Sequence, residues 1–260
     1  MPNRLRNLLN DSATNTKLII NAEDYAQKVL LQGKPIPWHD ATAYANHLSQ
    51  TAALLKPEVS VISIDKMIMQ ELADNEQLTS AMGEKSRAGY ALKTFMGNDD
   101  FKAAVSALVA STVQTQRVPV LVQMPSPLQM LYLTARAAKP DDEHEFDDDS
   151  AENAAIYCAD WLRAFKDANI AGLIFDEREG DVSDEAYQPI KNTAEHYQWV
   201  VGIRRDNEII FKDPQLSIAV LPSDYWTSGD SNVDTSGVVF TEIAQNAVPE
   251  QVLEFREKLG

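Results

Sequence analysis

The sequence predicts an α/β fold and, within that class, one (β/α)₈ barrel of the TIM type over residues 1–260. Apolar strands alternate with amphipathic helices along the whole chain, the order typical of α/β proteins. The strands are continuous apolar runs, as expected of parallel strands that are covered on both faces. The length also suits such a barrel, which typically needs about 250 residues. A doubly wound sheet is the alternative.

The first half of the chain begins with an extension over 1–32, in which 18–32 is expected to be a helix that ends at Gly33. Two prolines keep 34–38 extended, so we take it as the first strand. The expected elements that follow are helix 41–56, strand 58–64, a helical stretch 66–93 with a break at Gly83, helix 99–116 and strand 118–124.

The second half contains the clearest single unit, 152–177, which is an amphipathic helix, a turn and a buried strand followed by two carboxylates. Pro249 is suited to the first position of a final helix. The remaining expected elements are helices 127–138, 150–168 and 183–197 and strands 170–175, 199–203, 216–221 and 237–242, with 209–211 as a candidate eighth strand.

Composition excludes several classes of function. The net charge of −16 argues against nucleic acid and anionic membranes as partners, and no segment resembles a membrane span or a secretion signal. A cytoplasmic protein with a small-molecule substrate is expected. The single cysteine, Cys158, rules out an internal disulfide and a Cys-rich metal site. Glycine-rich nucleotide motifs are absent, so no cofactor is expected. The acidic run 141–149 is interpreted as a solvated loop, with a weak cation site as the alternative.

Three segments resemble the superfamily of uroporphyrinogen decarboxylase and cobalamin-independent methionine synthase. They are IYCADWLRAFKDANIAGLIFDE (156–177), VPVLVQMPSPLQML (118–131) and VVFTEIAQNAVPEQVLEFREKL (238–259). The resemblance implies a barrel with its site at the C-terminal mouth. The chain departs from the zinc-dependent methyltransferases of the superfamily, because it has no His-x-Cys and carries Ala244-Gln245-Asn246 where Cys-Gly is expected. We therefore expect no zinc. The R-Q-A-G-R loop of the decarboxylases is also missing.

The candidate catalytic residues follow strands, because the mouth of such a barrel is where chemistry occurs. Asp176 and Glu177 follow strand 170–175, and a partly desolvated carboxylate there can act as an acid or base. Asp65 ends strand 58–64 in the same way, although capping the next helix is its rival role. His39 is the best-placed histidine for catalysis, since it follows the expected first strand.

The candidate substrate-binding residues also follow strands. Arg204 could anchor a carboxylate in a bidentate way, with Arg205 as the more exposed partner or in the exchanged role. The other candidates are a neutral amide, two aromatic residues and a third carboxylate: Gln123, Tyr225, Trp226 and Glu242.

Three functions remain open on this sequence. The favoured one is a cofactor-independent lyase that decarboxylates or cleaves a small carboxylated substrate, with Arg204 as the anchor and Asp176 as the proton-transfer group. The second is a methyltransferase or demethylase component that works with a corrinoid or folate carrier, whose carrier protein would dock at the mouth. The third is a non-catalytic barrel that acts as a binding or regulatory subunit. A homodimer is left open as well.

Overall fold

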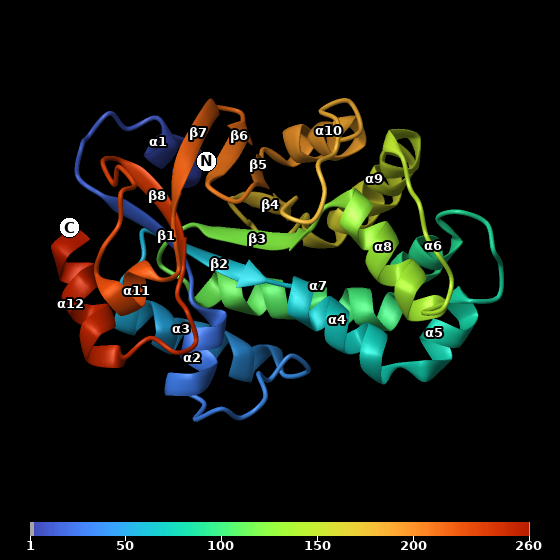
Figure 1. Ribbon diagram of the computed structural model, residues 1–260, viewed down its shortest axis with the longest axis horizontal. Helices are drawn as coiled ribbons and strands as arrows, with labels where there is room; N and C mark the ends of the chain where they lie inside the picture. The colour runs from blue at the N-terminus through green and yellow to red at the C-terminus, as the bar shows by residue number, and fades with distance from the viewer. Residues whose placement is uncertain (1–2, 260) are drawn as a thin grey trace.

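The computed structural model describes residues 3–259 and contains a closed barrel in which eight strands are paired in chain order, β1 to β8, with β8 returning to β1. Figure 1 shows helices below and to the right of the strands, with β6 and β7 at the upper edge of the molecule. The strands are β1 (Lys17–Asn21), β2 (Val59–Ser63), β3 (Val120–Pro125), β4 (Gly172–Asp176), β5 (Val200–Arg204), β6 (Glu208–Lys212), β7 (Gln215–Leu221) and β8 (Val238–Glu242). The fold is therefore an α/β barrel of TIM type, as predicted.

One strand departs from the regular pattern. β6 is antiparallel to both β5 and β7, whereas every other neighbouring pair is parallel. Only 205–207 and 213–214 connect these three strands, and a parallel crossover needs a dozen or more residues. The expectation of parallel strands throughout was therefore wrong at 209–211, which does supply the eighth strand.

Helices cover most of the outside of the barrel, and polar side chains cap several of their first turns. Asp40 accepts hydrogen bonds from the backbone N–H groups of Thr42 and Ala43, and Ser126 accepts one from Gln129. The helices are α1 (Arg4–Leu9), α2 (Glu23–Val29), α3 (Ala41–Leu55), α4 (Asp65–Asp74), α5 (Glu76–Met82), α6 (Tyr90–Met96), α7 (Asp99–Thr115), α8 (Pro127–Ala138), α9 (Asp148–Leu162), α10 (Gln188–Tyr197), α11 (Tyr225–Ser228) and α12 (Pro249–Leu259), with a 3₁₀ turn at Arg163–Phe165. Within residues 3–259, no helix has the length and apolar character that a membrane crossing requires.

The apolar core is divided by the barrel wall. One buried cluster fills the barrel interior and includes Ile19, Leu121, Ile174 and Phe240. The larger cluster lies outside the wall, where α3 to α10 pack on β2 to β5. A third packs α2, α11 and α12 on β1, β7 and β8. Successive strand residues point to opposite sides of the wall, and both sides are buried, which is why the strands between helices consist mainly of apolar residues.

The first helix closes the bottom of the barrel. Leu5 and Leu9 of α1 are buried in the interior cluster. The Asn3 side chain donates to the backbone carbonyls of Ala171 and Gln198 at 2.7 and 2.8 Å, just before β4 and β5 begin. The amino end of the chain therefore seals the end of the barrel opposite the mouth.

The structure corrects the sequence prediction at the start of the chain. Residues 18–32 do not form one helix, because β1 occupies Lys17–Asn21 and α2 begins only at Glu23. Segment 34–38 is not a strand, so the first strand was assigned to the wrong residues. A short apolar run such as LIIN fits a buried strand and a buried helix equally well by periodicity. The predicted helix 183–197 begins at Gln188, and 66–93 is divided into three helices.

Candidate functional site

The alternation of side chains across the barrel wall decides which residues reach the mouth. In β4, Ile174 belongs to the interior cluster and Phe175 to the outer one. Two residues further along from Ile174, Asp176 continues on the interior side and lies in register with Arg204 of β5. The interior positions at the strand ends are Asn21, Ser63, Gln123, Asp176, Arg204 and Glu242.

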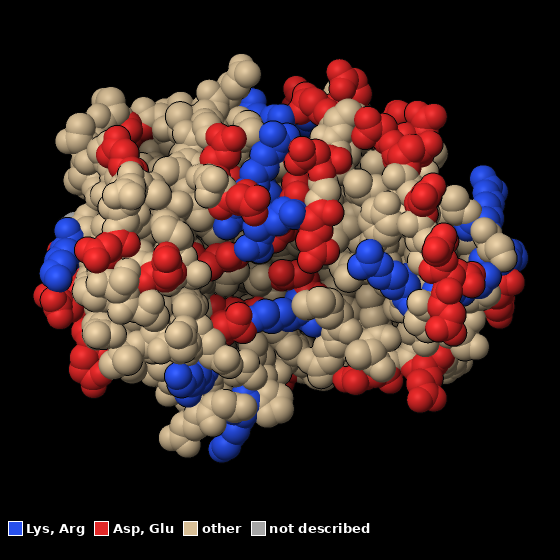
Figure 2. Space-filling view, in the orientation of Figure 1, with Lys and Arg blue, Asp and Glu red and all other residues tan. Residues whose placement is uncertain are grey.

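A pocket of about 300 Å³ opens among these residues. Its lining includes Asp65, Gln123 and Glu242, so the structure confirms that these predicted residues share one rim. Asp176 and Arg204 adjoin the same rim through their contacts with neighbouring side chains. Figure 2 shows acidic and basic side chains gathered in the middle of this face, over the ends of β2 and β3 in Figure 1.

Arg178 links two of the predicted carboxylates. Its Nε donates to both oxygens of Asp176 at 3.0 and 3.1 Å, and its Nη1 donates to Glu242 Oε2 at 3.0 Å. The backbone N–H of Arg178 also donates to Asp176 Oδ1. Both Asp176 oxygens are therefore hydrogen-bonded acceptors, and the hydrogen bonds that Arg178 donates to Asp176 raise the pKa of the Arg178 guanidinium. Arg178 was not among the site residues predicted from the sequence.

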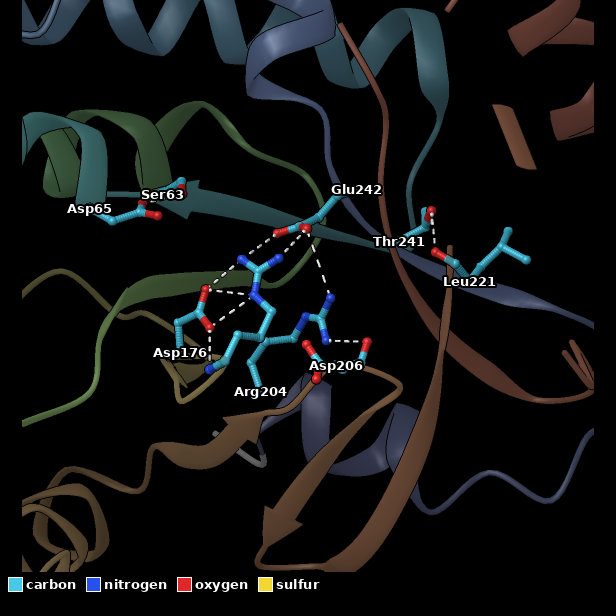
Figure 3. A network of polar contacts seen from close by, with 9 residues as sticks. Ser63, Asp65, Asp176, Arg204, Asp206, Leu221, Thr241 and Glu242 are labelled. Atoms are coloured by element: carbon cyan, nitrogen blue, oxygen red, sulfur yellow. Dashed lines mark hydrogen bonds and ion pairs between the residues drawn. The ribbon is translucent and has the colours of Figure 1, made fainter. Parts of the chain in front are cut away.

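Arg204 reaches the rim from β5, but its guanidinium is already engaged. Its side chain is 4% exposed, and its Nη2 lies 3.8 Å from Glu242 Oε2. Its Nη1 donates to the backbone carbonyl of Asp206 at 2.8 Å. Figure 3 shows Arg204, Asp176 and Glu242 converging from three strands. Burial lowers the pKa of Arg204, and the charge of Glu242 acts in the opposite sense. A carboxylated ligand would have to compete with Glu242 for this arginine.

A second carboxyl pair, Glu23 and Asp65, lies on the other side of the pocket. Burial, and next the charge of Asp65, raise the pKa of Glu23 well above its ordinary value. Burial also raises the pKa of Asp65, although the Ser63 hydroxyl donates to Asp65 Oδ1 and opposes this shift. The hydroxyl of Tyr44 donates to Glu23 Oε1 at 3.5 Å. The pair therefore favours holding a proton.

Glu23 was missed by sequence reasoning. The first strand was assigned to 34–38, so no residue near 21 was considered for the mouth. With β1 at Lys17–Asn21, Glu23 is the second residue past a strand end, just as Asp65 is past β2. Glu23 could have been found from the sequence because it lies two residues after the apolar run of β1, as Asp65 lies two residues after that of β2.

The comparisons with known proteins add a structural likeness only. No protein-family model and no curated protein matches the sequence. Among solved structures, a methyltransferase from Methanosarcina mazei aligns over 99% of both chains, with a TM-score of 0.56 and 10% sequence identity. This chain shares the fold of a methyltransferase. At that identity the likeness concerns the fold, not the reaction.

The residues present do not fit the zinc site that the superfamily resemblance would imply. Cys158 is fully buried in α9, and burial raises the pKa of its thiol to about 12. Ala244 lines the mouth pocket in the place where a cysteine would be expected. Within residues 3–259, no group of three or more His, Cys, Asp and Glu side chains is arranged to hold a metal ion. The acidic loop 141–149 forms no such group either.

Two predicted residues lie on the outer side of the wall. Glu177 and Arg205 each follow an interior residue at a strand end, so they lie on the outer side of the wall, where Glu177 is buried and Arg205 is partly exposed. Glu177 Oε2 lies 3.6 Å from Arg205 Nε, and neither carboxylate oxygen of Glu177 has a hydrogen-bond partner. Burial raises the pKa of Glu177. The placement of Glu177 in the mouth, beside Asp176, was therefore wrong.

Three further predicted residues lie away from the mouth pocket. His39 is exposed in the loop before α3 and lines a small recess with Trp38 and Phe101, so its expected place at a strand end was wrong. Tyr225 and Trp226 form α11 and are buried outside the barrel against α12. The mouth is accordingly blocked neither by Trp226 nor by the amino-terminal segment.

Proposed function

We propose that this chain is a methyl-transfer component that binds a small methyl donor at the barrel mouth and passes the methyl group to an acceptor on a separate carrier. The observation that carries the proposal is the Glu23–Asp65 carboxyl pair, which faces the pocket and favours a bound proton. The solved structure that shares this fold is named a methyltransferase, and for that reason we put this reaction class before the decarboxylase alternative. The carrier would be of the corrinoid or folate type.

The carboxyl pair would control the proton on the leaving atom. When the bond from the methyl carbon to the donor atom breaks, its electron pair stays on the donor atom, and the methyl carbon bonds to the nucleophile of the carrier. A protonated donor atom is a better leaving group, and Glu23 with Asp65 would supply or hold that proton. Asp176 is less suited to this role, because Arg178 occupies both its oxygens.

Decarboxylation of a carboxylated substrate is the second candidate. Arg178 and Arg204 at the rim favour it, since guanidinium groups bind carboxylates in a bidentate way. Glu242 contacts both arginines, so such a substrate would have to displace Glu242. A binding subunit without turnover is the third candidate.

One assay separates the three candidates. The full chain is incubated with methylated amines, thiols and ethers and with reduced cobalamin or tetrahydrofolate as acceptor, and the methylated acceptor is measured by mass spectrometry. Small carboxylic acids are tested in parallel for release of carbon dioxide. We expect methyl transfer, and we expect Asp65→Asn to lower its rate by roughly 10²–10⁴-fold. Carbon dioxide release would support the lyase, and ligand binding without either product would support the binding subunit.

A further inference from the structure

The lining of the mouth pocket contains more carboxylates than cations, and the cations are already engaged in ion pairs. Four carboxylates and two cations line it. Lys66 is paired with Asp24, and Arg178 is paired with Glu242 and with Asp176 behind it. Both cations are therefore already neutralised. The remaining carboxyl groups, Glu23 and Asp65, share one cation, Lys66. Its Nζ lies 3.9 Å from Glu23 Oε2 and also pairs with Asp24.

Two buried polar side chains in the same lining lack a partner. Glu23 Oε2 is buried without a hydrogen bond, on a side chain that is 8% exposed. Gln123 Oε1 is likewise buried without a partner, on a residue that is 1% exposed. Gln123 Oε1 is an acceptor, and so is Glu23 Oε2 when Glu23 is ionised; a buried acceptor without a donor costs free energy. The pocket therefore offers two acceptors to a ligand that donates hydrogen bonds.

We propose that the mouth pocket recognises a small protonated amine, whose positive charge is balanced by Glu23 and Asp65 and whose N–H groups donate to Glu23 Oε2 and Gln123 Oε1. A cation bound between two carboxyl groups takes the place of a proton that burial of the pair favours. The proposed amine is the substrate class of the methyl-transfer function proposed above. Only its role as a substrate rests on that function, because the binding of an amine is measured without turnover.

The binding of an amine is accordingly linked to pH. Glu23 is faced by Tyr44 from α3 and by Asp65 and Lys66 from α4, and Asp24 lies beside it on α2. The charge of Asp176 in β4 also raises the pKa of Asp65. At low pH a protonated carboxyl pair competes with the cation, so affinity increases as pH rises. Binding should release protons to the buffer.

The test uses ligands of one size and different charge. Propylamine, 1-propanol and propionate are titrated into the full chain at constant ionic strength by calorimetry, and tetramethylammonium supplies a cation without N–H donors. We expect propylamine alone to bind well and to bind more tightly at pH 8 than at pH 6. Proton release is measured in two buffers that differ in ionisation enthalpy.

The matched variants decide whether this pocket is responsible. Glu23→Gln and Asp65→Asn keep the shape of the side chains and remove a charge, so each should weaken propylamine binding roughly 10- to 100-fold. Glu152→Gln removes an exposed charge on α9 and should leave binding unchanged. Thermal melting confirms that each variant is folded.

The inference is overturned if propionate or 1-propanol binds as well as propylamine, if tetramethylammonium does, or if Glu152→Gln has the same effect as Glu23→Gln. Stabilisation by a divalent cation alone would also overturn it. Its failure is distinguishable from failure of the proposed function. If only neutral donors supply a methyl group, the proposal of amine recognition is wrong and the methyl-transfer function stands. If an amine binds and no methyl group is transferred, the methyl-transfer function is wrong and amine recognition stands.

Discussion

Arg178 and Glu242 are joined across the mouth of the barrel by a hydrogen bond of 3.0 Å from Nη1 to Oε2, although they stand 64 residues apart in the sequence. Arg178 lies in the loop after β4 and Glu242 ends β8. The same arginine holds Asp176, and Arg204 lies 3.8 Å from the same Glu242 oxygen. This network joins the two arginines to the barrel wall and makes them poor free anchors for an anion.

Removing Arg178 should destabilise the fold. Arg178→Ala leaves Asp176 and Glu242 facing each other without a shared donor, and breaking a buried ion pair costs about 3–5 kcal/mol. The Arg178 side chain is 34% exposed, so we expect about 1–3 kcal/mol instead. Urea denaturation at pH 7 measures the change. Arg178→Lys keeps the charge but loses the bidentate geometry, so its unfolding free energy should lie between those of the wild type and Arg178→Ala. An unchanged urea midpoint for Arg178→Ala would refute the structural role of Arg178.

The stability contributed by Glu23 should depend on pH in a defined direction. Its pKa is raised in the folded chain above the value of about 4.3 of an unfolded chain. The contribution is therefore complete below pH 4 and is lost as pH rises towards the folded-state pKa. Glu23→Gln removes this dependence, so the variant should gain in unfolding free energy relative to the wild type between pH 4 and pH 8. Glu152→Gln corrects for the general repulsion of an acidic protein, and a gain of equal size in that control would contradict the prediction.

Replacing Glu177 distinguishes a buried structural carboxyl from a catalytic one. Burial raises its pKa, so an ionised Glu177 is unfavourable at high pH. Glu177→Gln should therefore raise the free energy of unfolding by up to about 1 kcal/mol at pH 8 and change little at pH 4. Because Glu177 lies outside the barrel wall, turnover and propylamine affinity should stay within about twofold of the wild type. A loss of turnover comparable with that of Asp65→Asn would restore Glu177 as a catalytic residue.

Trp226 should matter for stability and not for binding. Its Nε1 donates to Thr241 Oγ1 at 2.7 Å, and the side chain is fully buried against α12. Trp226→Phe loses this hydrogen bond and leaves a small cavity, at a cost of about 1–3 kcal/mol. Thermal melting measures the loss. Propylamine affinity should be unchanged in the folded variant. Weakened binding would support the sequence prediction that Tyr225 and Trp226 belong to the substrate site.

The sequence by itself determined the α/β class, most of the strands and the rim on which Asp65, Gln123, Asp176, Arg204 and Glu242 meet. Continuous apolar runs and the polar residues that follow them carry this information, because hydrophobic burial fixes which segments form the wall. Alternation along β4 and β5 could also have separated Asp176 from Glu177 and Arg204 from Arg205.

Only the tertiary structure decided the rest. The run at 18–21 becomes β1 because β2 and β8 flank it, and nothing local distinguishes it from the start of a helix. That pairing brings Glu23 of α2 to Asp65 of α4, two carboxyl groups separated by 42 positions in the sequence. Their raised pKa values depend on burial and mutual proximity, which are properties of the assembled barrel.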